Sequence, residues 1–268
     1  MIRSMKRTSP KKRRGARLGQ HLLTNPAIAR AVAEAAGVTA GDMVLEIGPG
    51  TGMLTRELLK LGAYVVAIEK DSMMIEVLKR AFTKEIAEGS LELKEGDARQ
   101  LTPDEVFPRG GYKVAANIPY YITGELVREC LTAQNQPHAL AFLVQKEVAE
   151  RIARSKKESI LSLSVKAYGE PKYVRTVSKG NFNPMPSVDS AILAIRNISR
   201  KNFEHVSEEA FFRVVKAGFA QKRKTLAGNL KRAFGESALQ AIVDCGVPEK
   251  ARAEDVPLEK WIEIAEKI

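Results

Sequence analysis

A glycine-rich loop with acidic residues around it is the feature of this sequence best suited to holding a small ligand. The loop runs from Gly48 to Gly52 as Gly-Pro-Gly-Thr-Gly, and Glu46 stands just before it. Glu69 lies 21 residues after Gly48, and Asp97 follows further along the chain. Glycines let the backbone come close to a ligand, and an acid at this spacing accepts hydrogen bonds from ribose hydroxyls. The pattern therefore predicts a site for a ligand that contains a nucleoside.

These residues fall at the ends of short apolar segments that alternate with helical ones. The expected strands are Met43–Ile47, Tyr64–Ile68, Leu91–Lys94, Lys113–Ala116 and Leu140–Val144. The expected helices are Pro26–Ala36, Met53–Leu61, Ser72–Phe82, Gly124–Leu131 and Lys146–Arg154. This alternation favours a parallel sheet covered by helices on both faces. Because ligands bind at the carboxyl ends of the strands in such folds, we expect the acids and the loop along one edge of the sheet.

The second half of the chain has a different pattern. Two further strands, Leu161–Tyr168 and Ala191–Asn197, are expected at the sheet edge, separated by a loop rich in Pro and Asn at 180–186. After residue 200 the pattern is helical, with helices expected at Glu208–Ala220, Lys222–Phe234, Ser237–Asp244 and Leu258–Lys267. We therefore expect a basic disordered arm at 1–17, a ligand-binding α/β domain at 18–200 and a helical domain at 201–268.

The chemistry of the loop separates two candidate ligands. The loop lacks the Gly-x-Gly-x-x-Gly pattern of dinucleotide sites, and Glu46 would be a poor neighbour for the diphosphate of NAD. A ligand with a cationic amino acid end and an adenosine end fits better. The pattern resembles the S-adenosylmethionine (SAM) site of class I methyltransferases, in which Glu69 would hold the ribose and Asp97 the adenine amino group. Met53 and Met74 are expected to be core residues rather than ligand contacts.

The tetrapeptide Asn117-Ile118-Pro119-Tyr120 follows the fourth expected strand. It resembles the Asn/Asp-Pro-Pro-Tyr-like motif of methyltransferases that modify exocyclic amino nitrogens. An adenine amino nitrogen is a poor nucleophile because its lone pair is delocalised into the ring. The Asn117 side-chain oxygen and the Ile118 carbonyl can accept its two hydrogens and localise that pair, and Pro119 favours an extended Ile118. Tyr120 offers a stacking face worth about 1–3 kcal/mol per base. Direct transfer from a sulfonium needs no metal or covalent intermediate.

A base must leave its stack to reach such a pocket, and a second aromatic side chain would close its other face. Phe182, within the segment Asn181–Pro186, is the candidate, because the loop is polar and prolines stiffen it. The alternative is that Phe182 packs this loop onto the core.

Charge indicates a polyanionic partner. The 268 residues carry 43 Lys and Arg against 32 Asp and Glu, a net charge of +11. Residues 1–33 carry nine of these bases and no acid, and 216–232 is a second acid-free stretch. Phosphates are the expected contacts of such patches, with Arg13, Arg14, Arg17, Lys222, Arg223 and Lys224 as candidates. A transit peptide is the other interpretation of the arginine-rich N-terminus.

The cysteines, the histidines and the hydropathy argue against a disulfide-rich, a metal-binding or a membrane-spanning protein. Two cysteines make no disulfide framework, and three histidines show no metal-site spacing. No apolar run approaches the ~18 residues of a membrane span. We therefore expect a cytoplasmic protein without a metal.

Several longer segments resemble the KsgA/RsmA family of ribosomal RNA adenine dimethyltransferases. They are Leu18–Leu23, Leu143–Val148, Pro186–Ala191, Phe219–Leu226 and Arg252–Asp255. The resemblance implies a class I SAM-dependent methyltransferase fold, Rossmann-like with a mostly parallel seven-stranded sheet and a small C-terminal all-α domain. It implies N6,N6-dimethylation of two adjacent adenosines in the 3′-terminal hairpin of small-subunit rRNA on an assembling subunit. It also implies a monomer, and a basic helix around 222–224 that faces rRNA.

The SAM site expected from the loop, the acids and this resemblance consists of His21, Leu23, Glu46, Gly48, Gly50, Gly52, Glu69, Lys70, Asp97, Ala98 and Asn117. His21 stands where the family commonly has Asn. The sequence departs from the family's Tyr-Gly-Arg-Leu-Ser-Val at residues 160–165, which read Ile-Leu-Ser-Leu-Ser-Val. The alternatives are an Erm-like enzyme acting on large-subunit rRNA, a non-catalytic RNA-binding assembly factor, and a small-molecule methyltransferase.

Overall fold

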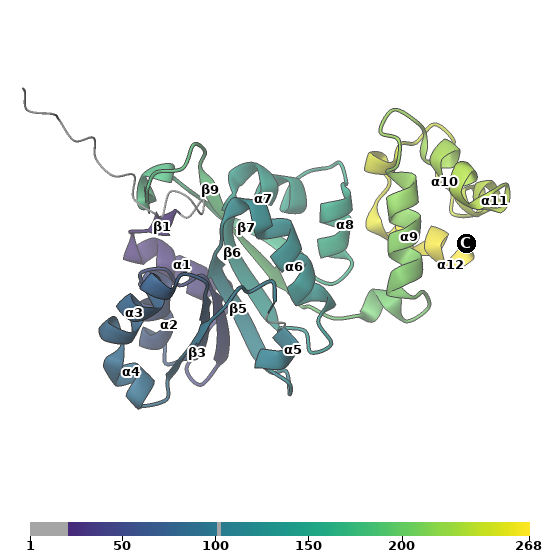
Figure 1. Ribbon diagram of the computed structural model, residues 1–268. Helices are drawn as coiled ribbons and strands as arrows, with labels where there is room; N and C mark the ends of the chain where they lie inside the picture. The colour runs from purple at the N-terminus through teal and green to yellow at the C-terminus, as the bar shows by residue number, and fades with distance from the viewer. Residues whose placement is uncertain (1–20, 101–102) are drawn as a thin grey trace, which may run out of the picture.

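A seven-stranded sheet forms the centre of the computed structural model, which describes residues 21–100 and 103–268 (Figure 1). Its strand order is β4-β3-β2-β5-β6-β9-β7. The strands are β2 (Met43–Ile47), β3 (Tyr64–Glu69), β4 (Leu91–Glu95), β5 (Tyr112–Asn117), β6 (Ala139–Gln145), β7 (Glu170–Val177) and β9 (Ser190–Arg196). Pairs from β4 to β6 are parallel, whereas β9 runs antiparallel to β6 and β7. This sheet confirms the expected fold class, with an antiparallel pair of strands, β9 and β7, added at one side.

Helices cover both faces of the sheet. One face carries α1 (Pro26–Ala35), α2 (Met53–Lys60), α3 (Ser72–Ala81) and α4 (Thr83–Ala87), and the other carries α5 (Pro103–Val106), α6 (Thr123–Thr132), α7 (Lys146–Ala153) and α8 (Ile160–Lys166). Alternate residues of one strand enter different cores: Leu140 and Phe142 of β6 pack with α6, while Ala141 and Leu143 pack with α1. Strand side chains alternate between faces, so a strand buried on both faces must be apolar throughout, as β6 is.

Four helices follow the last strand and lie beside α8 (Figure 1). They are α9 (Glu208–Gly218), α10 (Leu226–Phe234), α11 (Ser237–Asp244) and α12 (Leu258–Lys267). Trp261 is fully buried among them. Gly218 lies so close to this ring that a Cβ there would come within 2.3 Å of it. Close helix packing thus explains this glycine. We propose that the boundary between the α/β domain and the helical domain lies near residue 200.

A small second sheet pairs β1 (Leu22–Leu23) with β8 (Phe182–Asn183) in antiparallel fashion. It fixes residues near the start of the chain against the loop that precedes β9. Neither of these two-residue strands was expected from the sequence, because pairs this short carry no periodicity.

The sequence prediction for residues 161–168 was wrong. The segment forms helix α8, and the strand that pairs with β9 is β7, further along the chain. The Ser159 hydroxyl caps α8 by accepting a hydrogen bond from the Ser162 backbone N–H, and the Ser162 hydroxyl accepts one from the Ser159 backbone N–H. This capping box starts a helix. The alternation of apolar residues and serines resembled a strand, but Leu163 and Val165 are buried as parts of a helix.

The expected helix Lys222–Phe234 also begins later than predicted. Helix α10 starts at Leu226, after Thr225 caps it through the Gly228 backbone. Lys222, Arg223 and Lys224 therefore lie in the turn before α10 and not on a basic helix. An N-cap residue has non-helical backbone angles, and Thr225 is extended. The helix therefore begins after Thr225 and is shorter than predicted.

Candidate functional site

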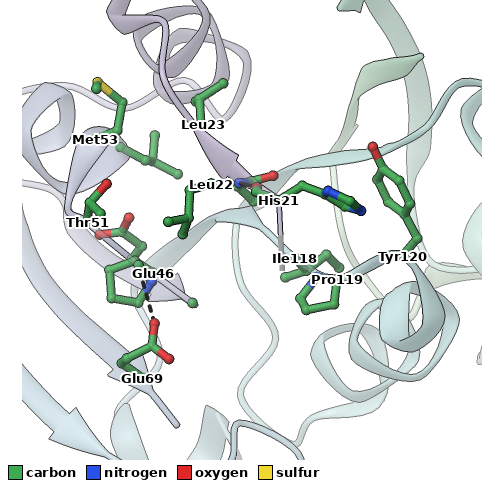
Figure 2. Close-up of a pocket in the computed structure, with 15 residues that line it drawn as sticks. His21, Leu22, Leu23, Glu46, Thr51, Met53, Glu69, Ile118, Pro119 and Tyr120 are labelled. Atoms are coloured by element: carbon green, nitrogen blue, oxygen red, sulfur yellow. Dashed lines mark hydrogen bonds between the residues drawn. The ribbon is translucent and has the colours of Figure 1, made fainter. Parts of the chain in front are cut away.

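A pocket opens at the carboxyl ends of β2, β3 and β5 (Figure 2). Figure 2 shows Glu46 and Glu69 on one side, His21 and Tyr120 on the other, and Pro119 between them. An adjacent pocket shares Gly48, Glu69 and Pro119 with the first and extends to the end of β4. The two pockets therefore lie next to each other along the sheet edge, where the sequence predicted the ligand.

The glycine-rich loop turns with positive φ at Gly48, Gly50 and Gly52, at +67°, +57° and +81°. Gly48 and Gly50 line the pocket. Gly52 does not: a Cβ there would lie 2.3 Å from the Phe82 ring. The prediction that Gly52 contacts a ligand is therefore corrected, because its missing side chain makes room for the core between α2 and α3. Met53 packs against the core, as expected, and also lines the pocket.

Glu46 is buried at the end of β2, with 1% of its surface exposed. Its Oε2 accepts a hydrogen bond from the Thr55 hydroxyl at 2.6 Å. Burial raises the pKa of this carboxyl to about 8, with Glu69 contributing repulsion, although the Thr55 bonds lower it. A carboxyl held this way in a pocket wall becomes a favourable partner for a cation that enters the pocket.

The raised pKa predicts how Glu46→Gln changes stability. In the unfolded chain the carboxyl ionises near its ordinary value, so between about pH 4.5 and 8 only the folded protein retains the proton. Wild-type stability therefore falls across this interval by up to ~1.4 kcal/mol per pH unit. The Gln variant lacks this loss. We expect the variant's Tm minus the wild-type Tm to grow by at least about 3 °C from pH 5.5 to 8.5, measured by calorimetry without ligand. Exposed Glu88→Gln should follow the wild type, and parallel curves for Glu46→Gln would contradict the prediction.

Glu69 ends β3 and is 2% exposed. Its Oε2 accepts from the Gly50 backbone N–H at 3.0 Å, and its Oε1 accepts from the Asp71 N–H at 2.9 Å. The carboxylate is thereby fixed in orientation by the glycine loop and by the first residues after the strand. Each oxygen keeps a further lone pair for a donor such as a hydroxyl.

Asp97 follows β4 and is held by two cations. Lys70 Nζ donates to its Oδ2 at 2.8 Å, and Arg99 donates from Nε and from Nη2 at 3.0 and 2.6 Å. The Arg99 hydrogen bonds, followed by Lys70, hold the pKa of Asp97 far below its usual range. Lys70, Asp97 and Ala98, three of the residues expected at the cofactor site, line the second pocket. Arg99 lines it too, and only its place two residues after the acid marked it in the sequence.

Asn117 ends β5, and its orientation is set by the chain's N-terminal segment. Its Nδ2 donates to the His21 carbonyl at 2.9 Å. His21 is itself held, because its Nδ1 donates to the Pro184 carbonyl at 2.8 Å. With the amide nitrogen turned to a carbonyl, Oδ1 is left as an acceptor that no described residue uses. An amide in this position can accept a hydrogen bond from an incoming amino group.

The rest of the tetrapeptide lines the same pocket. Pro119 has φ −58° and ψ 135°, and Tyr120 begins a 3₁₀ turn to Ile122. The Tyr120 hydroxyl lies 2.7 Å from the Ser190 hydroxyl, and its ring centroid lies 5.7 Å from that of His21. Burial raises the pKa of Tyr120. The ring is thus held as a neutral wall of the pocket.

The prediction for Phe182 is corrected. Its side chain is 5% exposed and packs in the core beneath β1, where it pairs with Leu23. It does not line the pocket, because alternation along β8 turns Phe182 inward and Asn183 outward. Leu23, expected at the cofactor site, is also buried but lines the pocket. Thr51, which the sequence did not single out, lies at the pocket wall as well.

The predicted basic residues that the structure describes, Lys222, Arg223 and Lys224, do not line this pocket. Arg13, Arg14 and Arg17 lie outside the described residues. Lys222 and Lys224 line a separate cleft between α7–α8 and the C-terminal helices. In the part of the chain described, no cluster of three or more His, Cys, Asp or Glu side chains could hold a metal, and no helix is long and apolar enough to cross a membrane.

Comparison with known proteins identifies the family. The model of the ribosomal RNA adenine dimethylase family matches residues 11–268. A protein of Dehalococcoides mccartyi named ribosomal RNA small subunit methyltransferase A is 38% identical over 249 residues, covering 91% of this chain and 84% of that protein. Its namesake in Deinococcus radiodurans is 39% identical, with 90% and 81% covered.

Solved structures agree with this. A dimethyladenosine transferase from Plasmodium falciparum is 26% identical with a TM-score of 0.72, covering 91% of this chain and 96% of its own. The 23S rRNA methyltransferase ErmE is 25% identical with a TM-score of 0.73, covering 92% and 98%. The chain therefore belongs to the ribosomal RNA adenine dimethylase family, as an enzyme that takes its methyl groups from S-adenosyl-L-methionine.

Proposed function

We propose that this enzyme dimethylates N6 of two adjacent adenosines in the 3′-terminal hairpin loop of small-subunit rRNA. The observation that carries the proposal is Asn117, whose Nδ2 is committed to the His21 carbonyl while Oδ1 remains free to accept. The relatives named ribosomal RNA small subunit methyltransferase A, at 38–39% identity, favour the small subunit. The 23S rRNA methyltransferase ErmE, which would favour the large subunit, is only 25% identical to this chain.

The residues of the pocket fit S-adenosyl-L-methionine as the cofactor. Gly48 lines both pockets and has φ +67°, a backbone conformation that L side chains rarely adopt. Glu46 would face the cationic amino acid end of SAM, Glu69 would accept hydrogen bonds from its ribose hydroxyls, and Asp97 would accept one from its adenine amino group. When bound, SAM supplies a sulfonium-activated methyl group.

The chain's own contribution is to position and activate the amine. Asn117 Oδ1 and the Ile118 carbonyl accept the two amino hydrogens, which localises the nitrogen lone pair in the direction of the methyl group. Tyr120, held by Ser190 at 2.7 Å, stacks on the flipped adenine. Prior positioning of this kind removes much of the entropic part of the barrier, and the fixed acceptors need no reorganisation as charge develops on the nitrogen.

A basic cleft of about 580 Å³ supports rRNA binding by the C-terminal helices. Four cations line it without an ion-pair partner among the described residues, namely Arg151, Lys222, Lys224 and Arg252. Its acids are neutralised, since Glu158 is paired with Lys166 and Glu254 with Lys157. A cleft of this composition suits a phosphate backbone.

The variant Lys222→Glu with Arg223→Glu tests this interface. Both side chains are exposed, so the fold should persist. We expect affinity for small subunits to fall at least about tenfold and the slope of log affinity against log salt to decrease by about 2, with SAM binding unchanged. The variant Lys79→Glu with Lys84→Glu makes the same change of net charge on α3 and α4 and should bind as the wild type. Equal binding by the two double variants would show that the rRNA interface lies elsewhere on the protein.

The function itself is tested with tritiated SAM and ribosomal subunits that lack the modification. We expect label in two adjacent dimethyladenosines of small-subunit rRNA after nucleotide mapping. Label in large-subunit rRNA would support the Erm-like alternative, and label in neither, despite SAM binding, would support a non-catalytic assembly factor.

The cellular context is a further part of the proposal. An adenine in a hairpin loop must leave its stack to be methylated, and the loop is most accessible before the subunit is complete. We therefore infer that the enzyme acts as a monomer on an immature small subunit in the cytoplasm. Comparing label incorporated into assembly intermediates and into mature unmethylated subunits tests this inference.

A further inference from the structure

The C-terminal helices are attached to the rest of the protein at both ends of α8. The first attachment follows the end of this helix. The Tyr168 hydroxyl donates to Glu208 at the start of α9, and Arg200 Nε donates to the same carboxylate at 2.7 Å. Asn202 Nδ2 donates to the Ala167 carbonyl at 2.8 Å. The Tyr168 and Phe203 rings, 4.9 Å apart between centroids, extend the apolar core into α9. This attachment is extensive and partly buried.

The second attachment precedes the start of α8 and is much smaller. The Glu158 backbone N–H donates to the Glu254 carbonyl at 2.7 Å. Lys157 Nζ forms an ion pair with the Glu254 carboxylate and lies 3.7 Å from Asp255. Glu254 belongs to the segment Arg252–Asp255, a motif that the proposed chemistry does not use.

Between these two attachments the contact is incompletely filled. A largely apolar cavity of about 310 Å³ lies between α6, α8 and α9, and the basic cleft opens beyond it. This space is partly open to solvent, so α8 and α9 do not pack closely along it, and a weakly packed contact permits relative motion. The first attachment can therefore serve as a pivot, and the second then fixes the angle between the two parts.

Further hydrogen bonds hold the residues on both sides of the second attachment in place. On the α8 side, Glu158 Oε1 accepts from Lys166 at 2.5 Å and Oε2 accepts from the Ser162 hydroxyl at 2.7 Å. On the other side, the Leu226 N–H donates to the Ala251 carbonyl at 2.8 Å, just before the motif. Leu226 begins α10, immediately after the turn at 222–224. A displacement of Glu254 is thus transmitted to the basic turn.

We propose that Lys157 and Glu254 are positioning residues that latch the C-terminal helices to the start of α8. The latch sets the distance between the basic turn at 222–224 and the catalytic pocket. It rests on the proposed function, because the geometry matters only if rRNA spans the cleft and the pocket. The expected consequence is an effect on rRNA recognition without an effect on the cofactor site.

Lys157→Glu tests the latch in the full-length protein, because it places a carboxylate against Glu254 and Asp255. Spin labels at Val77→Cys on α3 and Val243→Cys on α11, both exposed sites, report the distance between the two parts. We expect a broader distance distribution, a rise of about fivefold or more in the KM for unmethylated small subunits, and kcat and SAM affinity within about twofold of wild type. The exchanged pair Lys157→Glu with Glu254→Lys should restore the narrow distribution and most of the affinity.

Lys260→Glu is the matched control, since it reverses a lysine charge in an ion pair confined to α12. It should leave both the distance and KM unchanged. An unchanged distance distribution and KM in Lys157→Glu would overturn the latch, as would an exchanged pair no better than the single variant. The spin-label distance needs no RNA, so it decides the latch even if the wild type fails to methylate small subunits.

Discussion

Replacing Asn117 with alanine is expected to slow methyl transfer by about 100- to 1,000-fold, the loss typical of removing one preorganised hydrogen-bonding group from an active site. The variant removes the Oδ1 acceptor and with it the geometry that localises the amine lone pair. It also removes the bond from Nδ2 to the His21 carbonyl at 2.9 Å. Single-turnover methylation of small subunits with saturating SAM measures the rate, and calorimetry measures SAM affinity, which should stay within about threefold of wild type.

Asn202→Ala controls for the loss of an amide of the same kind. The Asn202 side chain also donates to a backbone carbonyl, that of Ala167, but lies at the C-terminal helices and not in the pocket. It should methylate at nearly the wild-type rate. Near-normal turnover by Asn117→Ala would show that the acceptor role is wrong, whereas a large loss of SAM affinity in that variant would assign Asn117 to the cofactor instead.

Glu69→Gln is expected to weaken SAM binding by about 10- to 100-fold, because it replaces a charged acceptor at the ribose position. The wild-type carboxylate accepts from Gly50 N–H and from Asp71 N–H, one on each oxygen. A glutamine has only one oxygen, so its amide nitrogen must face one of these donors. The variant therefore also loses the fixed orientation of the acceptor. Isothermal titration with SAM measures the change directly.

The kinetic signature of Glu69→Gln should be opposite to that of Asn117→Ala. At saturating SAM its methylation rate should recover most of the wild-type value, because the residue holds the cofactor and not the amine. Glu76→Gln, at an exposed position on α3, should leave the SAM affinity unchanged. SAM binding by Glu69→Gln within twofold of wild type would remove Glu69 from the cofactor site.

The outline of the α/β part was predictable because its signals are local. A strand buried on both faces must be apolar along its length, and glycine and acidic residues mark the strand ends. Met43–Ile47 forms β2 with the predicted bounds, and Glu69, Asp97 and Asn117 were expected at one edge because parallel strands bring their ends together. Segments with short or mixed patterns were less predictable: residues 161–168 alternate like a strand, yet the Ser159 capping box starts a helix there.

The polar edge of the sheet and the chemistry of its side chains were predictable, since residue type and spacing along each strand decide which groups reach the carboxyl ends. The partners of those groups were not predictable, because they come from distant parts of the chain. His21 orients Asn117 across 96 residues of chain, and Arg99 and Lys70 share Asp97. The tertiary structure also turned Phe182 into the core and Gly52 toward Phe82. Contacts between distant segments depend on how helices and strands pack against one another. Such packing leaves no periodic pattern in the sequence around either residue of a contact.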